Sequence, residues 1–295
     1  MNQHAANLDA ALGAAVERAA PSVVRIQHGR RATSGFVFRE PNLVLTSSAY
    51  LRRCGEVRVA DHDGNHHSAE LLGRTAGTDV AVLRVEGELP PLEFRGTNGL
   101  MTGNLCLALG RPGRAIRASL RIIGVLADGI DTPRGGHLDR YVETDRGLPM
   151  GFAGGPLLDL GGEAIGLNTD AILRGADLAV PQPTLEQVVD AIVSEGGVKR
   201  GYLGISVRPV HLPKAIQDAQ EQKRGALIIA VEEGSPAEAS GLTLGDTFLT
   251  IGDDPITGPR SLASALRGRP SEKVKATILR AGTVTEIEIE TGERL

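Results

Sequence analysis

Short apolar segments of strand length recur along the chain as far as residue 168. Glycine or proline separates them about every ten residues, a spacing typical of an all-β sandwich or barrel. The pair Gly161-Gly162 lies between two such segments and predicts a tight hairpin. The predicted strands are residues 22–27, 35–39, 43–46, 56–60, 79–85, 104–109, 120–126, 141–143, 156–160 and 164–168.

Two amphipathic helices are predicted on either side of these strands. The first has its apolar positions from Leu8 to Ala19 on one face, with Asn7 as its N-cap and Pro21 at its end. The second has an apolar face between Leu185 and Ile192 and closes at Gly196-Gly197. This double glycine predicts a domain boundary.

Residues 199–295 have a different pattern, that of a smaller β-rich module. Two short helices are marked there by a capping Ser235 and by Pro259. Ala281-Gly282 separates two alternating segments and predicts a hairpin. The predicted strands of this module are residues 203–207, 226–231, 247–251, 274–279 and 283–289. We therefore predict a mainly β chain with domains at residues 1–198 and 199–295.

Composition and charge narrow the classes of function. Lys and Arg total 32 and Asp and Glu total 36, so the net charge is −4 and no basic patch for nucleic acid is predicted. No apolar run approaches the roughly 20 residues that span a bilayer. The polar N-terminus and the two cysteines, Cys54 and Cys106, favour the cytoplasm, or the periplasm if a leader has been removed. No cofactor or metal is expected.

Three segments carry candidate chemistry, and their order is informative. They are residues 45–49 (LTSSA), 78–83 (TDVAVL) and 151–158 (GFAGGPLL). In this order they resemble the histidine, aspartate and serine segments of HtrA-type serine proteases, a branch of the trypsin-like fold. Residues 201–205 (GYLGI) resemble the carboxylate-binding loop of the PDZ domain that follows in that family. The resemblance implies a trypsin-like double β-barrel followed by a PDZ domain.

Catalysis in this family needs a serine, an imidazole that takes its proton, and a carboxylate that orients the imidazole. Here the carboxylate remains as Asp79, but the histidine position is Ala49 and the serine position is Ala153. A methyl group can neither attack a carbonyl nor accept a proton, so we predict a pseudoprotease. The alternatives are an active HtrA-type endopeptidase in which both residues were replaced by design, and a rebuilt triad.

Two observations help to choose among these alternatives: the other residues that could act as a nucleophile, and the residues that flank the two alanines. No histidine is adjacent in sequence to the candidate hydroxyls and thiol, which makes a rebuilt triad the weaker hypothesis. Natural loss is favoured because the residues around both alanines are also altered, with Phe152 in place of a small polar residue. The substitute candidates are Ser34, Thr46, Ser47, Ser48 and Cys54.

The residues left in the cleft have two interpretations each. Asp79 is either an orphaned triad carboxylate or, as we expect, a buried group that accepts backbone N–H groups of residues 46–49. The amides of Gly151 and Ala153 either keep an oxyanion hole that binds without reacting, or belong to a collapsed loop with Phe152 over the cleft.

The PDZ-like loop gives the best-supported function. Its amides can bind a terminal carboxylate, and the following strand can pair with a ligand strand. The resemblance implies C-termini or unfolded segments of other proteins as partners, in an adaptor, scaffold or chaperone role. The alternative is that the same residues only fill the core of a structural oligomer. The candidate peptide-binding residues are Tyr202, Leu203, Gly204, Ile205, Leu262, Ala265 and Leu266.

Three further features have alternative interpretations. Residues 61–67 (DHDGNHH) could hold a metal, but Asp63-Gly64 favours a hairpin turn. Residues 128–139, rich in glycine and aspartate, predict a surface loop. The first helix either joins a homotrimer, as in HtrA-type proteins, or packs on its own barrel. Mixed assembly with an active paralogue is a further possibility that the resemblance implies.

Overall fold

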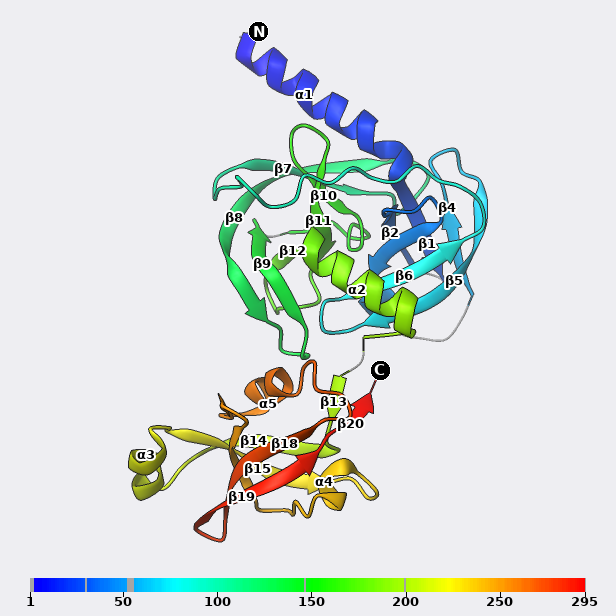
Figure 1. Ribbon diagram of the computed structural model, residues 1–295. Coiled ribbons are helices and arrows are strands. Elements are labelled where there is room, and N and C mark those ends of the chain that lie inside the picture. Colours follow the sequence, from blue (N-terminus) through cyan, green and yellow to red (C-terminus); the bar gives the residue numbers. More distant parts are fainter. Residues whose placement is uncertain (1–2, 30, 52–55, 146, 199, 295) are drawn as a thin grey trace. The chain divides into compact units, whose positions relative to one another are not determined.

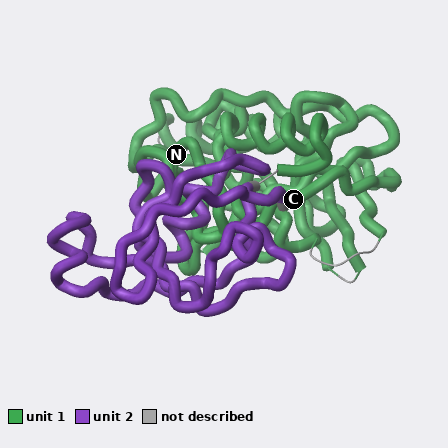
Figure 2. Tube along the Cα trace, turned by 60° about the horizontal axis from the view of Figure 1, so that its bottom comes forward, with its two compact units in different colours: residues 1–198 green, residues 199–295 purple. Residues whose placement is uncertain are grey.

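The chain divides into two units, residues 1–198 and 199–295 (Figure 2). The computed structural model describes residues 3–29, 31–51, 56–145, 147–198 and 200–294. Each unit has its own buried apolar core. The fold is mainly β.

The first unit contains two closed barrels of six antiparallel strands each (Figure 1). In the first barrel the strand order is β1-β2-β3-β6-β5-β4, and β1 pairs with β4 to close it. Closure leaves no free edge, and alternate residues point into the interior. The strands are β1 (Val23–His28), β2 (Arg31–Val37), β3 (Leu43–Ser47), β4 (Val57–Ala60), β5 (His66–Thr75) and β6 (Val80–Val85).

The second barrel has the order β10-β11-β12-β9-β8-β7. The predicted loop at residues 128–139 is wrong, because β8 and β9 continue through it as a hairpin with only residues 132–136 between them. Leu138 pairs with Ile130 and is fully buried, so tertiary packing extends the ladder past the local turn residues. The strands are β7 (Leu105–Gly110), β8 (Arg117–Asp131), β9 (His137–Thr144), β10 (Pro156–Leu158), β11 (Ala164–Thr169) and β12 (Asp177–Pro181).

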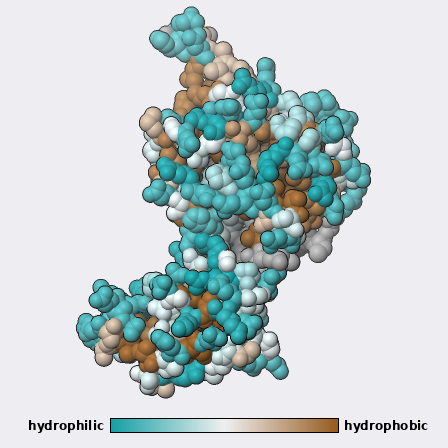
Figure 3. All heavy atoms as spheres, in the orientation of Figure 1, coloured by the Kyte–Doolittle hydropathy of each residue, from teal (hydrophilic) through white to brown (hydrophobic). Residues whose placement is uncertain are grey.

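Helices α1 (Gln3–Ala19) and α2 (Gln182–Glu195) belong to the same unit. The prediction of Asn7 as N-cap is wrong, because α1 begins at Gln3 and Gln3 Nε2 donates to the Asn7 side chain within the helix. Apolar side chains gather where α1 meets the barrel, while its N-terminal end is hydrophilic (Figure 3). Helix α2 contacts strands of both barrels and ends at Gly196, which has φ +74°. A short 3₁₀ helix, η1 (Ala20–Ser22), contains Pro21.

The second unit is built on one sheet with the order β14-β15-β16-β18-β19, in which β17 pairs with β16. The predicted hairpin at residues 274–289 is confirmed as β18 and β19. Helix α3 was not predicted, because it buries no residue and so lacks an apolar face. The strands are β14 (Ile205–His211), β15 (Arg224–Val231), β16 (Thr247–Ile251), β17 (Asp254–Pro255), β18 (Lys273–Arg280) and β19 (Thr283–Glu290); the helices are α3 (Lys214–Gln220), α4 (Pro236–Ala239) and α5 (Pro259–Ala265).

The predicted strand at residues 203–207 is interrupted near its start. Strands β13 (Arg200–Tyr202) and β20 (Gly292–Arg294) form a separate two-stranded sheet, and β14 begins only at Ile205. Between them Gly204 has φ +74°, a conformation that breaks a strand and favours glycine. The capping role predicted for Ser235 is confirmed, since its side chain accepts a hydrogen bond from the amide of Glu238 at the start of α4.

Candidate functional site

The carboxylate of Asp79 lies between the two barrels and accepts three hydrogen bonds. Ser47 Oγ donates to Oδ2 at 2.6 Å, and the amide of Ala49 donates to Oδ1 at 2.8 Å. Thr169 Oγ1, from the second barrel, also donates to Oδ2 at 2.6 Å. The sequence led us to expect backbone donors from residues 46–49; the structure gives one backbone amide and two hydroxyls.

Burial and hydrogen bonding act on the pKa of Asp79 in opposite directions. The residue is 2% exposed, and burial raises the pKa of its carboxyl group above the usual value. Hydrogen bonds from Ser47, Thr169 and Ala49 lower the pKa, but burial together with the negative charge of Asp170 outweighs them. Donors other than an imidazole therefore engage both carboxylate oxygens. Ala49, which the sequence resemblance assigned to the position of the family's histidine, contacts Asp79 through its backbone amide.

The turn at residues 149–155 contains Ala153, which the sequence resemblance assigned to the position of the family's serine. Its carbonyls are held from the first barrel: Ser34 Oγ donates to the Gly151 carbonyl at 2.6 Å, and Thr33 Oγ1 donates to the Ala153 carbonyl. The amide of Gly155 closes the turn on the carbonyl of Phe152 at 2.9 Å. Ser34 also accepts a hydrogen bond from the amide of Arg111, so its hydroxyl is committed to structure.

The same turn brings the alanine positions into one region. A Cβ atom on Gly154 would lie 2.6 Å from the backbone nitrogen of Ser47, so only glycine allows this close approach to β3. Ala49 follows β3 by two residues, and Asp79 reaches it by a hydrogen bond. Within the described part of the chain, the amides of Gly151 and Ala153 have no hydrogen-bond acceptor. Two backbone donors thus remain available at this turn.

Phe152 does not cover the cleft, so this part of the collapsed-loop alternative is wrong. Its side chain is 2% exposed and belongs to the core of the second barrel with Cys106, Ala108 and Ile165. A Cβ atom on Gly110 would lie 2.9 Å from the Phe152 ring, so the glycine makes room for the aromatic side chain. Burial of this large apolar surface favours the inward position. Cys54, the other candidate nucleophile, lies outside the described residues.

The loop between β13 and β14 has the features of a carboxylate-binding turn. The amide of Glu232 donates to the Gly204 carbonyl at 2.8 Å, and the amide of Ala237 donates to the Leu203 carbonyl at 2.9 Å. The amides of Leu203 and Gly204 have no acceptor among the described residues. With the carbonyls occupied and the amides unused, the loop presents hydrogen-bond donors rather than acceptors.

The residues expected to line an apolar pocket gather beside this loop. Leu203, Leu262, Ala265 and Leu266 are 2–7% exposed, and Ile205 is partly buried against them. A hydrogen bond at 3.1 Å from the amide of Gly201 to the carbonyl of Leu266 fixes the C-terminal end of α5 at the loop. The hydroxyl of Tyr202 donates to Glu232. These side chains also belong to the core of the unit, so both earlier interpretations of them fit their positions.

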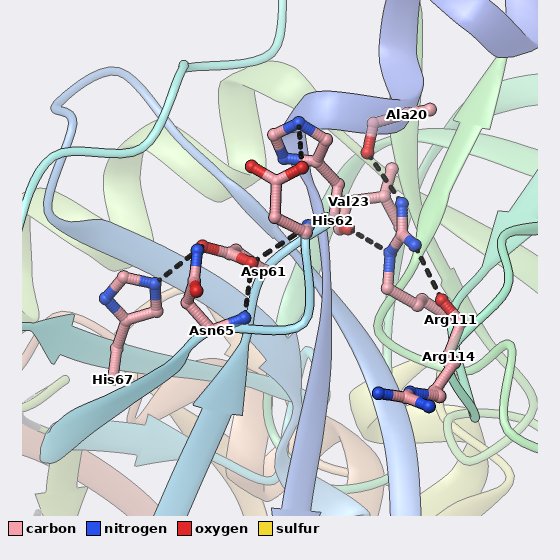
Figure 4. Close-up of polar contacts among 9 residues, drawn as sticks. Ala20, Val23, Asp61, His62, Asn65, His67, Arg111 and Arg114 are labelled. Carbon is pink, nitrogen blue, oxygen red and sulfur yellow. Dashed lines mark hydrogen bonds and ion pairs between the residues drawn. The ribbon is translucent and has the colours of Figure 1, made fainter.

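Residues 61–65 form the turn between β4 and β5, and the predicted hairpin is confirmed by the pairing of Ala60 with His66. Asp61 accepts hydrogen bonds from the amides of Asp63 and Asn65, both at 2.9 Å, and from His67 Nε2 at 3.0 Å (Figure 4). Burial opposes ionisation, but the hydrogen bonds from His67 and Asn65 outweigh it and lower the pKa of Asp61 to about 2.

The ligand atoms of Asp61, His62 and Asp63 lie within 4.8 Å of one another. The turn itself uses both oxygens of Asp61, which explains their arrangement without an ion. Arg111, drawn in the same view, donates to the carbonyls of Val23, Arg114 and Ala20 at 2.7–3.0 Å (Figure 4). It ties the end of β7 to η1 and to the first residue of β1.

Two closed barrels with a buried carboxylate between them define the trypsin-like serine protease class, and the second unit adds a PDZ-like sheet. Comparison with known families agrees: residues 33–167 match the trypsin-like peptidase domain, and residues 201–291 match the PDZ domain. The chain therefore has the HtrA-type arrangement of a trypsin-like serine protease domain followed by a PDZ domain.

Individual relatives match most of this chain. A probable periplasmic serine endoprotease, DegP-like, from Chlamydia trachomatis serovar D is 31% identical over 264 residues, which cover 87% of this chain and 53% of that protein. A probable periplasmic serine endoprotease, DegP-like, from Rhizobium meliloti is 29% identical over 277 residues, which cover 89% of this chain and 53% of that protein. The chain thus spans about half the length of the curated relatives it matches.

A solved structure of the HtrA-type protease AlgW with a decapeptide superposes with a TM-score of 0.74. It is 27% identical in sequence, and the match covers 96% of this chain and 99% of that one. None of the described helices is both long and apolar enough to cross a bilayer.

Proposed function

We propose that this chain is a proteolytically inactive HtrA-like protein that binds C-termini or extended segments of other proteins through its PDZ domain. The observation that carries this proposal is the pair of alanines, 49 and 153, beside a carboxylate whose two oxygens are already engaged by Ser47, Ala49 and Thr169. Neither alanine side chain can attack a carbonyl or take up a proton. An adaptor, scaffold or chaperone role follows from binding without cleavage.

Binding uses the unoccupied donors of the second unit. The amides of Leu203 and Gly204 bind the terminal carboxylate, and β14 pairs with the ligand as an added strand. The terminal side chain packs among Leu203, Leu262 and Leu266, and burial of an aliphatic side chain there contributes about 1.5–3 kcal/mol. The relative AlgW, solved with a decapeptide, supports a peptide as the class of ligand.

The second candidate function is serine endopeptidase activity, which the names of the Chlamydia and Rhizobium relatives favour. Cleavage of fluorescent casein by protein from the unmodified gene, together with labelling by an active-site phosphonate, separates the two. We expect neither turnover nor label. Codons for histidine and serine at positions 49 and 153 of that gene would show that the alanines were introduced by design.

A C-terminal peptide library, measured by fluorescence polarisation, tests the binding function. We expect peptides with a free carboxylate and an apolar last residue to bind, and the same peptides with a C-terminal amide to bind at least tenfold more weakly. Gly204→Val is the matched variant, because a Cβ atom there would lie 2.3 Å from the Cβ atom of Ser235. Uniform absence of binding would favour a structural oligomer instead.

Compartment and assembly are proposed from the relatives. Their names place them in the periplasm, so the periplasm replaces the cytoplasm as our proposal for this chain. Cell fractionation of the natural gene product tests it, with release by osmotic shock as the expected result. We retain a homotrimer, or mixed assembly with an active paralogue, as the proposed oligomer. Analytical ultracentrifugation of the chain alone and with such a paralogue distinguishes these states.

A further inference from the structure

Strand β14 (Ile205–His211) lies at an edge of its sheet. Among the described residues it forms its ladder with β15 alone, so its other side carries backbone groups without a strand partner (Figure 1). Alternate residues of a strand direct their N–H and C=O groups to opposite sides. The residues that face the free side decide which hydrogen bonds an added strand can make.

Two hydrogen bonds at the ends of the strand fix this alternation. The Gly204 carbonyl accepts from the amide of Glu232 at 2.8 Å, and the amide of Leu212 donates to the Lys223 carbonyl at 3.1 Å. Both even-numbered residues therefore face β15. The register shift in this pair places the extra residue, Ile229, on β15, so the alternation along β14 is uninterrupted. Residues 205, 207, 209 and 211 face the free edge.

Pro209 is one of these edge-facing residues and has no N–H group. Proline is tolerated in a sheet where its nitrogen faces away from the ladder, which agrees with the alternation. The free edge therefore offers a donor and an acceptor at Ile205 and at Val207, but only an acceptor at Pro209.

Helix α5 gives this edge a direction. Its C-terminal end is tied to the loop by the hydrogen bond from Gly201 to Leu266. Its N-terminal end adjoins Pro209, since a Cβ atom on Gly258 would lie 3.4 Å from the Cβ atom of Pro209. A ligand strand antiparallel to β14 would thus end at the loop and enter past Pro209.

We propose that Pro209 limits recognition to the last three or four residues of a ligand C-terminus. This inference rests on the proposed peptide-binding function. The last ligand residue pairs with Ile205 and the third from the end pairs with Val207. The carbonyl of the fifth from the end meets Pro209 and finds no donor. The ligand class is therefore a short protruding tail on a folded or disordered protein, rather than a long extended segment.

Acetylated peptides of three and six residues, both ending in valine and with serine at the added positions, test this proposal by isothermal titration of the full chain. We expect the two peptides to bind the wild-type chain within about twofold of each other. Pro209→Ala supplies the missing donor, so the six-residue peptide should bind this variant about two- to tenfold more tightly than the wild type. The affinity of the three-residue peptide should stay unchanged. Arg208→Ala is the matched control, because its backbone faces β15 and its substitution adds no donor.

Each other outcome overturns one identifiable statement. A folded Pro209→Ala chain that binds both peptides as the wild type does would overturn the length limit, as would an equal gain for both. If neither peptide binds to the wild-type chain, the proposed function itself would be overturned. Hydrogen exchange tests the length limit on the wild-type chain alone. An eight-residue peptide should protect the amides of Ile205 and Val207 and leave the amide of His211 unprotected.

Discussion

At the scale of single residues, Asp79 joins two barrels through one buried carboxylate. Its donors come from β3, from the turn after it and from β11. Asp79→Ala would leave two hydroxyls and an amide without an acceptor, and should lower the free energy of unfolding by about 2–4 kcal/mol. Asp79→Asn keeps an acceptor and should cost less than about half of that. Urea denaturation at pH 7 measures both; equal costs would show that the hydrogen bonds contribute little.

The pair Asp61 and His67 makes stability depend on pH in two ranges. The pKa of Asp61 falls from 3.8 to about 2 on folding, so its stabilisation is present above pH 4 and is lost as the pH falls toward 2. The hydrogen bond to Asp61 raises the pKa of His67 above 6.5, so the stabilisation from protonated His67 is present below pH 6.5 and is lost as the pH rises through the raised value.

His67→Ala should therefore cost more stability at pH 5.5 than at pH 9. We expect about 1 kcal/mol at pH 5.5, measured as the shift in urea midpoint multiplied by the slope of the transition. The exposed neighbour His66 is the matched control, and His66→Ala should cost under about 0.5 kcal/mol at both pH values. An identical cost of His67→Ala at the two pH values would argue against a protonated histidine at this turn.

At the scale of elements, the turn at residues 149–155 has a fixed backbone but side chains that differ from those expected of the family. Its carbonyls are fixed by Thr33 and Ser34, and two of its amides stay available, but Phe152 occupies the core of the second barrel. Ala49→His combined with Ala153→Ser should therefore give weak endopeptidase activity at most. Phosphonate labelling and casein cleavage measure it, with the single variant Ala153→Ser as control. Full activity would show that the Phe152 position leaves the cleft in working geometry.

Sequence patterns located elements better than they located their ends. The Ala281-Gly282 hairpin and the Ser235 cap follow from local rules of backbone conformation, and both are present. The predicted start of α1 and the predicted length of the β8–β9 hairpin were both wrong. Packing in the second barrel explains how far β8 and β9 continue, whereas the exposed start of α1 has no such explanation. Thr169 was missed as a donor to Asp79, since 90 residues of chain separate the two and only barrel closure brings them together.

At the scale of the whole molecule, the two units have separate cores, and the boundary we propose lies at residues 198 and 199. Residues 199–295 expressed alone should fold cooperatively, because their sheet and the helices α4 and α5 bury their own apolar side chains. We expect a urea midpoint within about 0.5 M of that of the same unit in the full chain, followed by circular dichroism. A molten fragment would mean that the first unit stabilises the second.

The sequence by itself determined the strand-rich character, the glycines that allow tight turns, and the two alanines at the positions that we assign to the family's histidine and serine. These depend on local stereochemistry or on which atoms a side chain has, and neither changes on folding. The tertiary structure alone decided which donors meet Asp79, where the Phe152 ring lies and which side of β14 carries Pro209. Those facts depend on contacts and strand register between distant segments, which many local patterns permit and only the packed chain selects.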